Sequence, residues 1–125
     1  MNRGLFYSSG TSGTITDTYT MTSGTATLYS RAFIEDSEST DEKTLFIVCA
    51  DDDASTPTIA VAIALTFDGG TTWSDYTTIE AASAVAKQVK ITSYAKSWWV
   101  KNTGVKFRIT KSGAAAVTFT SGKWI

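Results

Sequence analysis

Apolar and polar residues alternate with a period of two along much of this chain. Residues 14–22, TITDTYTMT, place threonine on one face and larger, mostly apolar side chains on the other. Residues 58–67, TIAVAIALTF, place isoleucine, valine and leucine on one face and small alanines on the other. A period of two is the pattern of a strand that buries one face. Both segments are therefore predicted to be strands.

The same reading extends to most of the remaining sequence. Residues 43–50, KTLFIVCA, are apolar on both faces after the second residue, which predicts a central strand. Further strands or extended segments are expected at 26–34, 74–79, 88–92, 105–110 and 116–120. Residues 79–89, IEAASAVAKQV, have room for one short turn of helix. About eight strands separated by Gly, Ser and Asp turns predict an all-β fold, an antiparallel β-sandwich that is jelly-roll-like.

The length of 125 residues is that of one domain. We expect a single β-sandwich domain over residues 14–125, preceded by an N-terminal arm or edge strand over residues 1–13. That first segment carries Leu5, Phe6 and Tyr7 in a Gly/Ser-rich setting. Its one arginine and short apolar run do not form a signal-peptide core, and no apolar stretch reaches membrane-spanning length. We therefore expect a chain that is made in the cytoplasm, is not secreted and has no membrane partner.

The amino-acid composition excludes several kinds of catalytic and metal-binding site. The chain has no histidine and one cysteine, Cys49, so imidazole-based catalysis, Cys-His dyads and His- or Cys-built metal sites are excluded. The run Asp51–Asp53 and the acids around residues 35–42 offer hard oxygen ligands for calcium, but they lack EF-hand spacing. Two solvated acidic loops flanking the strand 43–50 are the favoured explanation of these acids. We predict no catalytic residue, no metal site, no cofactor and no enzymatic activity.

Charge is divided between the two parts of the chain. Residues 1–80 contain all 12 acids and three bases, whereas residues 81–125 contain eight bases and no acid. These opposite charges either cancel within one sandwich or form complementary patches between copies of the chain. The bases are spaced along the sequence and not clustered, which disfavours nucleic acid as a partner.

The most specific local signal is the turn TFDGGTTW, residues 66–73. Asp-Gly-Gly between strands predicts a hairpin, because glycine adopts positive φ without steric cost. The aspartate accepts backbone N–H bonds within such a turn. Five residues carry the pattern: Thr66, Asp68, Gly70, Thr72 and Trp73.

These five residues fill every position of the Asp-box, Ser/Thr-x-Asp-x-Gly-x-Thr-Trp, which the turn therefore resembles. In sialidases and other sugar-processing propellers, the Asp-box is a structural hairpin away from the active site. Here it occurs once, and the arginine cluster and length of a sialidase are absent. The resemblance implies a structural turn and not a glycosidase.

A wider resemblance covers about the last two thirds of the chain. An Asp-Gly-Gly turn after a strand, then a basic strand such as GVKFRIT at 104–110, within a short Thr-rich chain, is similar to small tailed-phage virion proteins. The resemblance implies a capsid decoration (cement) protein that bridges capsid subunits, or a neck or tail accessory protein. It implies location in the virion, with the major capsid protein, other virion proteins and copies of itself as partners. Under this hypothesis, removing residues 1–9 weakens attachment without unfolding the domain.

Aromatic residues supply the candidate contacts. Neighbouring residues of a strand point to opposite faces, so one of Trp98 and Trp99 is expected in the core and the other outside it. The candidate interface comprises Leu5, Phe6, Tyr7, Trp98, Trp99 and Trp124. The same tryptophans would serve a carbohydrate-binding β-sandwich module by stacking on sugar rings, and this alternative stays open.

Overall fold

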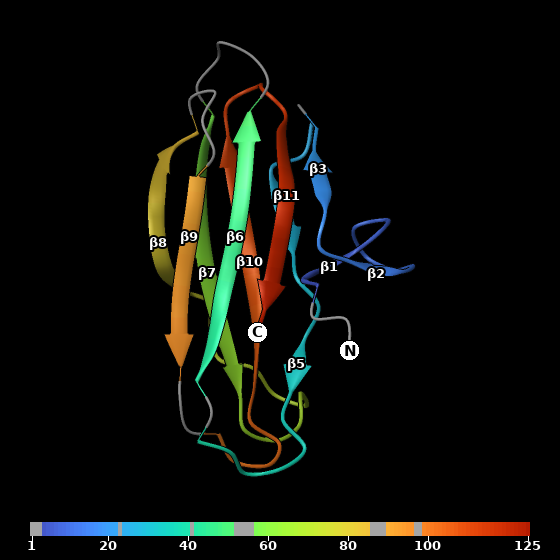
Figure 1. The fold of residues 1–125 in the computed structure, drawn as a ribbon, viewed down its shortest axis with the longest axis vertical. Coiled ribbons are helices and arrows are strands. Elements are labelled where there is room, and N and C mark those ends of the chain that lie inside the picture. Colours follow the sequence, from blue (N-terminus) through green and yellow to red (C-terminus); the bar gives the residue numbers. More distant parts are fainter. Residues whose placement is uncertain (1–3, 23, 41, 52–56, 86–89, 97–98) are drawn as a thin grey trace.

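The chain is folded into two antiparallel β-layers that face each other (Figure 1). The structure, a computed structural model, describes residues 4–22, 24–40, 42–51, 57–85, 90–96 and 99–125. These residues form strands and no helix. The strands are β1 (Phe6–Tyr7), β2 (Ile15–Thr16), β3 (Tyr19–Met21), β4 (Thr27–Tyr29), β5 (Phe33–Ile34), β6 (Lys43–Asp51), β7 (Thr58–Thr66), β8 (Thr77–Ala84), β9 (Lys90–Lys96), β10 (Gly104–Ser112) and β11 (Val117–Trp124).

Eight of these strands make up the two layers. One sheet has the order β3-β11-β6-β9, and the other has the order β4-β10-β7-β8, with the short β5 also paired to β10. Counted as the first to eighth strands along the chain, they lie in the orders 1-8-3-6 and 2-7-4-5. This is the arrangement of an eight-stranded jelly roll built from two Greek keys. The predicted fold class is confirmed.

The alternation of apolar residues sets the faces of these strands. In β7, Ile59, Val61 and Ile63 are buried between the sheets. β7 pairs with β10 over nine residues, from Thr58↔Ser112 to Thr66↔Gly104. The doubly apolar β6 lies between β11 and β9, so the prediction of a central strand is also confirmed.

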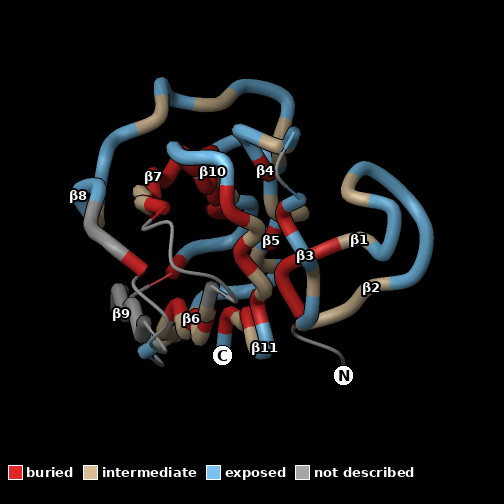
Figure 2. Tube along the Cα trace, turned by 90° about the horizontal axis from the view of Figure 1, so that it is seen from above, coloured by how far each residue is buried: buried red, intermediate tan, exposed pale blue. Residues whose placement is uncertain are grey.

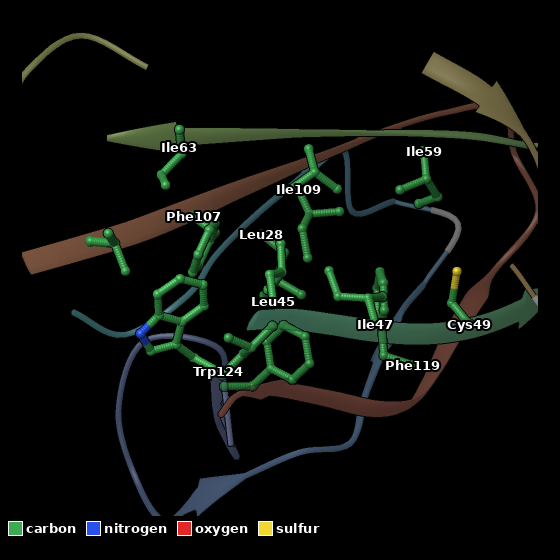
Figure 3. Packing of buried hydrophobic residues seen from close by; sticks show 14 of the residues in the cluster. Leu28, Leu45, Ile47, Cys49, Ile59, Ile63, Phe107, Ile109, Phe119 and Trp124 are labelled. Atoms are coloured by element: carbon green, nitrogen blue, oxygen red, sulfur yellow. The ribbon is translucent and has the colours of Figure 1, made fainter. Parts of the chain in front are cut away.

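Buried residues of both sheets face the space between the layers (Figure 2), and their large side chains fill it (Figure 3). Trp124 meets Trp99 edge-on at a ring-centroid distance of 5.7 Å and lies 5.5 Å from Phe107. Cys49 is buried in the same cluster, as its apolar strand predicts. This is the close packing expected of a two-layer core.

The N-terminal segment is part of this core and does not stand apart as an arm. β1 and β2 form a small hairpin that projects to one side of the sandwich, but Leu5 and Phe6 are fully buried (Figure 2). The Phe6 ring lies 5.5 Å from the Phe119 ring, and a Cβ on Gly122 would come within 2.6 Å of it. Only glycine leaves room for the ring there.

Two further expectations are corrected. Of the residues 79–89 that had room for a helical turn, residues 79–84 belong to β8 and form none, because they pair with β7 through irregular register, and residues 86–89 lie outside the described residues. The threonine-rich stretch 14–22 is not one strand: β2 pairs with β1, whereas β3 pairs with β11. The chain changes partner near Asp17, whose carbonyl accepts a bond from the Gly122 N–H.

The burial of Phe6 generates a stability prediction. Phe6→Ala is expected to lower the free energy of unfolding by about 3–5 kcal/mol, the usual cost of removing a buried aromatic ring. Chemical denaturation followed by tryptophan fluorescence measures this loss. Thr11→Ala, in the exposed loop of the same hairpin, is the matched control and should change little. An unchanged midpoint for Phe6→Ala would restore the view of the segment as a detachable arm.

Candidate functional site

The turn after β7 is held by hydrogen bonds that centre on Thr66 and Asp68. The Thr66 hydroxyl donates to the Asp68 carboxylate at 2.9 Å and accepts from the Gly70 N–H at 3.0 Å. The Asp68 carboxylate also accepts from the Thr72 N–H at 2.9 Å and from the Thr72 hydroxyl. The Trp73 indole N–H closes the turn on the Gly70 carbonyl at 3.1 Å.

The backbone of this turn explains its glycines. Gly69 and Gly70 have φ values of 74° and 95°, in the left-handed region that other residues rarely adopt. The Gly69 N–H also donates to the Asn102 carbonyl, which ties the turn to the loop before β10. All five residues singled out in the sequence therefore take part in one structural hairpin, and their hydrogen bonds are those that the Asp-box pattern predicts.

The hydrogen bonds also set the acidity of the central carboxylate. The Thr72 hydroxyl, the Thr72 N–H and the Thr66 hydroxyl lower the pKa of Asp68 from 3.8 to about 2. Asp68 is therefore ionised at all ordinary pH values. A carboxylate in this state accepts hydrogen bonds and does not act as a general acid.

Next to the turn, aromatic rings and cations gather on the outer face of the sheet β4-β10-β7-β8. Ala62 and Ala64 of β7 are paired with Arg108 and Lys106 of β10, so these four side chains share the outer face. Trp73 and Tyr76, from the loop between β7 and β8, lie against the two cations. We name this surface the aromatic–cationic strip; its members are Tyr29, Trp73, Tyr76, Lys106 and Arg108.

Distances within the strip show alternating rings and cations. The Lys106 ammonium lies 4.5 Å from the centroid of the Trp73 ring and 5.8 Å from that of Tyr76. The Arg108 guanidinium lies 4.7 Å from the Tyr76 ring. The Tyr29 and Tyr76 rings are 6.1 Å apart with an interplanar angle of 50°. Each contact is within the range of an attractive cation–π or aromatic pair.

Exposure differs along the strip. Tyr29 is 52% exposed, and Tyr76 and Trp73 are half-buried. Burial raises the pKa of the Tyr76 hydroxyl, with a further rise from Tyr29 and an opposing effect of Arg108. Tyr76 therefore remains a neutral phenol that donates and accepts hydrogen bonds.

A shallow pocket adjoins the strip. It has a volume of about 360 Å³ and shares Trp73 with the strip. Its other lining residues are Leu65, Phe67, Asp68, Thr72 and Ser74. The lining combines apolar surface with one carboxylate and two hydroxyl groups, which suits a ligand with both apolar faces and hydroxyl groups.

The predicted interface residues lie elsewhere, and most are internal. Leu5, Phe6, Trp99 and Trp124 are fully buried, so the expectation that they are surface anchors is corrected. Each points between the sheets, where large apolar side chains gain most from leaving water. Tyr7 is half-buried in the small hairpin. Trp98 lies outside the described residues, while the burial of Trp99 confirms that one of the pair is in the core.

The acidic residues form no recognisable metal centre in the described part of the chain. No group of three or more candidate ligand side chains is found there. Asp41, Asp52 and Asp53 lie outside the described residues. Glu35 forms an ion pair with Lys43. Asp17 lies 3.6 Å from Lys123, so one ion pair joins the acidic and basic parts of the sequence within a single molecule. Among the described residues, no helix suits a membrane span.

Sequence reasoning missed most of the strip. Tyr29, Tyr76, Lys106 and Arg108 were not singled out, although the alternation of β10 already places Lys106 and Arg108 on the face opposite to Phe107 and Ile109. The sequence did not indicate that Trp73 and Tyr76 lie on this outer face, because their position depends on the path of the loop after the turn.

No family model and no curated protein matches the chain. Among solved structures, it is similar to the CBM22-1 xylan-binding domain of Paenibacillus barcinonensis Xyn10C, with 13% identity, 85% of this chain and 67% of that chain covered, and a TM-score of 0.48. It is also similar to the CBM22-1–GH10 modules of Clostridium thermocellum endo-1,4-β-D-xylanase 10B complexed with xylohexaose. There the identity is 14% and the TM-score 0.47; the match covers 98% of this chain and 24% of that chain. Both scores are below 0.5, so neither likeness carries an argument about what this chain binds.

The lowered pKa of Asp68 generates a pH prediction. A carboxylate with a depressed pKa stabilises the folded state above its ordinary value of 3.8, and that contribution is lost as the pH falls through about 2. Asp68→Asn should therefore unfold at a lower temperature than the unmodified chain at pH 7, and the difference should shrink between about pH 4 and pH 2. Thermal unfolding at several pH values measures it.

Asp75→Asn is the matched control, because the Asp75 carboxylate lies in the same loop but accepts none of the bonds of the turn. It should leave the unfolding temperature nearly unchanged. A difference between Asp68→Asn and the unmodified chain that is the same at pH 2 and pH 7 would contradict a role for the charged carboxylate.

Proposed function

We propose that this chain is a non-catalytic β-sandwich module that binds carbohydrate on the aromatic–cationic strip. The observation that carries this proposal is the pair of Tyr29 and Tyr76 on the outer face of a sheet. Arg108 of β10 is opposite Tyr29 in the register of the sheet and lies against the Tyr76 ring. The pair is formed by residues from separate parts of the chain and is partly open to solvent. It is not needed to fill the core, which lies on the other face of the same sheet.

The chemistry of the strip suits a sugar. A pyranose ring has apolar C–H faces and a rim of hydroxyl groups, so it contacts the face of an aromatic ring and hydrogen-bonds at its edges. Tyr29 and Tyr76 provide two inclined ring faces and two phenolic hydroxyls. Lys106 and Arg108 provide donors beside them.

Substitution of either tyrosine tests the proposal. Tyr29→Ala and Tyr76→Ala should each weaken binding about tenfold, since truncation of a tyrosine that anchors a ligand commonly costs more than about 1 kcal/mol and about 1.4 kcal/mol is a factor of ten. Affinity electrophoresis against a panel of soluble polysaccharides, followed by calorimetry, measures this. The panel includes xylan, since the similar Paenibacillus barcinonensis domain is a xylan-binding domain.

Tyr7→Ala is the control, because Tyr7 is a half-buried tyrosine in the small hairpin. Tyr29→Phe keeps the ring and should retain most of the affinity. Binding that is unaffected by both alanine substitutions, or no binding to any member of the panel, would count against the proposal.

A second function is favoured by a different observation. Ile34, Phe67 and Val100 are exposed apolar residues, with Phe67 71% exposed. They belong to β5, the turn after β7 and the turn before β10, which meet at one end of the sandwich through bonds such as Gly69 N–H to Asn102 carbonyl (Figure 1). Exposed apolar residues at one end suit a protein contact.

On this basis, the alternative is a tailed-phage virion protein, most simply a capsid decoration protein. Its partners would be the major capsid protein, other virion proteins or copies of the chain, and many weak contacts would stabilise the particle. The copy number in purified particles, measured by quantitative mass spectrometry, tests it. A number comparable to that of the major shell protein indicates decoration, and a ring's worth indicates a neck or tail role. Absence from particles removes the alternative.

A further inference from the structure

We infer that the aromatic–cationic strip selects acidic polysaccharides, whose carboxylate or sulfate groups bind to Arg108 and Lys106 while a sugar ring lies on Tyr29. This inference rests on the proposed function and names its ligand class. Three features of the strip carry it: the charge state of its cations, a buried donor without a partner, and the position of the exposed ring.

The first feature is that the strip holds two positive charges without a negative one. Neither Lys106 nor Arg108 forms an ion pair with a carboxylate of the described residues. Two other cations of the sandwich are compensated: Lys43 is paired with Glu35, and Lys123 with Asp17. Lys106 and Arg108 contact aromatic rings instead.

The second feature is the Nε atom of Arg108. It is buried and has no hydrogen-bond partner. A buried donor without an acceptor costs free energy, so such atoms in folded proteins call for an explanation. Guanidinium groups bind carboxylates and sulfates through two parallel N–H donors, and the Nε–H is one that takes part in such pairs. Because the Nε atom itself has no exposed surface, an anionic group bound to the guanidinium would reach the Nε–H only after a movement of a neighbouring side chain.

The third feature is how the rings hold the cations in place. Lys106 lies between Trp73 and Tyr76, and Arg108 lies over Tyr76, so both long side chains are held before a ligand arrives. A side chain that is already ordered loses less entropy on binding. Tyr29 lies directly beside Arg108 in the register of β4 and β10 and is the most exposed ring of the strip. A sugar ring on Tyr29 would place its acidic substituent next to Arg108.

These features separate acidic from neutral sugars. A neutral polysaccharide would use the rings but leave both positive charges without a counter-charge, whereas an acidic one would use rings and cations together. The chain as a whole has a net charge of −1, so general attraction to polyanions would not produce the same selectivity.

The test uses polysaccharide pairs in which one member carries the anionic group and the other does not. Polygalacturonate is compared with its fully methyl-esterified form, and dextran sulfate with dextran, by affinity electrophoresis and calorimetry of the full chain. We expect at least about tenfold tighter binding to the charged member of one pair. The pair that responds identifies the anionic group as a carboxylate or a sulfate.

Arg108→Gln should reduce this preference about tenfold. Arg108→Lys should restore part of the preference, because the charge returns without the two-donor geometry. Lys101→Gln, which removes an exposed positive charge outside the strip, is the matched control and should keep the preference. Thermal unfolding checks that each variant is folded, and Lys106→Gln replaces Arg108→Gln if the latter is not.

The outcomes distinguish this inference from the proposed function. If the chain binds both members of each pair equally and Tyr29→Ala abolishes this binding, the inferred selectivity is overturned. The proposed function then stands as a module that does not distinguish neutral from acidic sugars. A preference for the charged member that survives in Arg108→Gln and Lys106→Gln also overturns it. No binding to any polysaccharide overturns both proposals.

Discussion

The nine-residue pairing of β7 with β10 is the constraint on which the rest of the structure depends. It joins two strands that are distant in sequence and fixes the register of the central part of one sheet. Because side chains alternate across a strand, this register places Ile59, Val61 and Ile63 on the same side as Phe107 and Ile109. A slip by one residue would exchange every buried residue for an outward-facing one, so the core and the outer face are specified together.

The outer face follows from the same pairing. The three middle outward positions of β7 are alanines, Ala60, Ala62 and Ala64, and the outward positions of β10 include Lys106 and Arg108. Because alanine side chains are short, the loop after β7 can pack Trp73 and Tyr76 over this face. There the two rings contact Lys106 and Arg108. Ala64 has no exposed surface, although it points away from the core. Small side chains at Ala62 and Ala64 thus leave the space that the rings of the strip occupy.

The turn after β7 links the scaffold to the strip. Its hydrogen bonds through Thr66 and Asp68 fix the direction in which the chain leaves β7, and Trp73 is the residue at which it closes. The indole therefore has two roles: its N–H completes the turn, and its ring contacts Lys106. The Asp-box-like turn, which stabilises the hairpin, thus also positions one end of the candidate binding surface.

The sequence by itself determined most of the longer strands, the fold class and the turn, because these depend on local patterns: the period of two, the doubly apolar run of β6 and the Asp-Gly-Gly segment. It also indicated that one of two adjacent tryptophans is internal. It could not determine which aromatic residues stay outside. Leu5, Phe6 and Trp124 were expected to be surface anchors near the two termini, but the structure buries all three in the core. Tyr29, Tyr76 and Arg108 come together only through pairing of β4 with β10 and the path of the loop before β8. Such contacts join residues up to about eighty positions apart, and only the tertiary structure decides them, since local sequence patterns carry no information about which distant strands become neighbours.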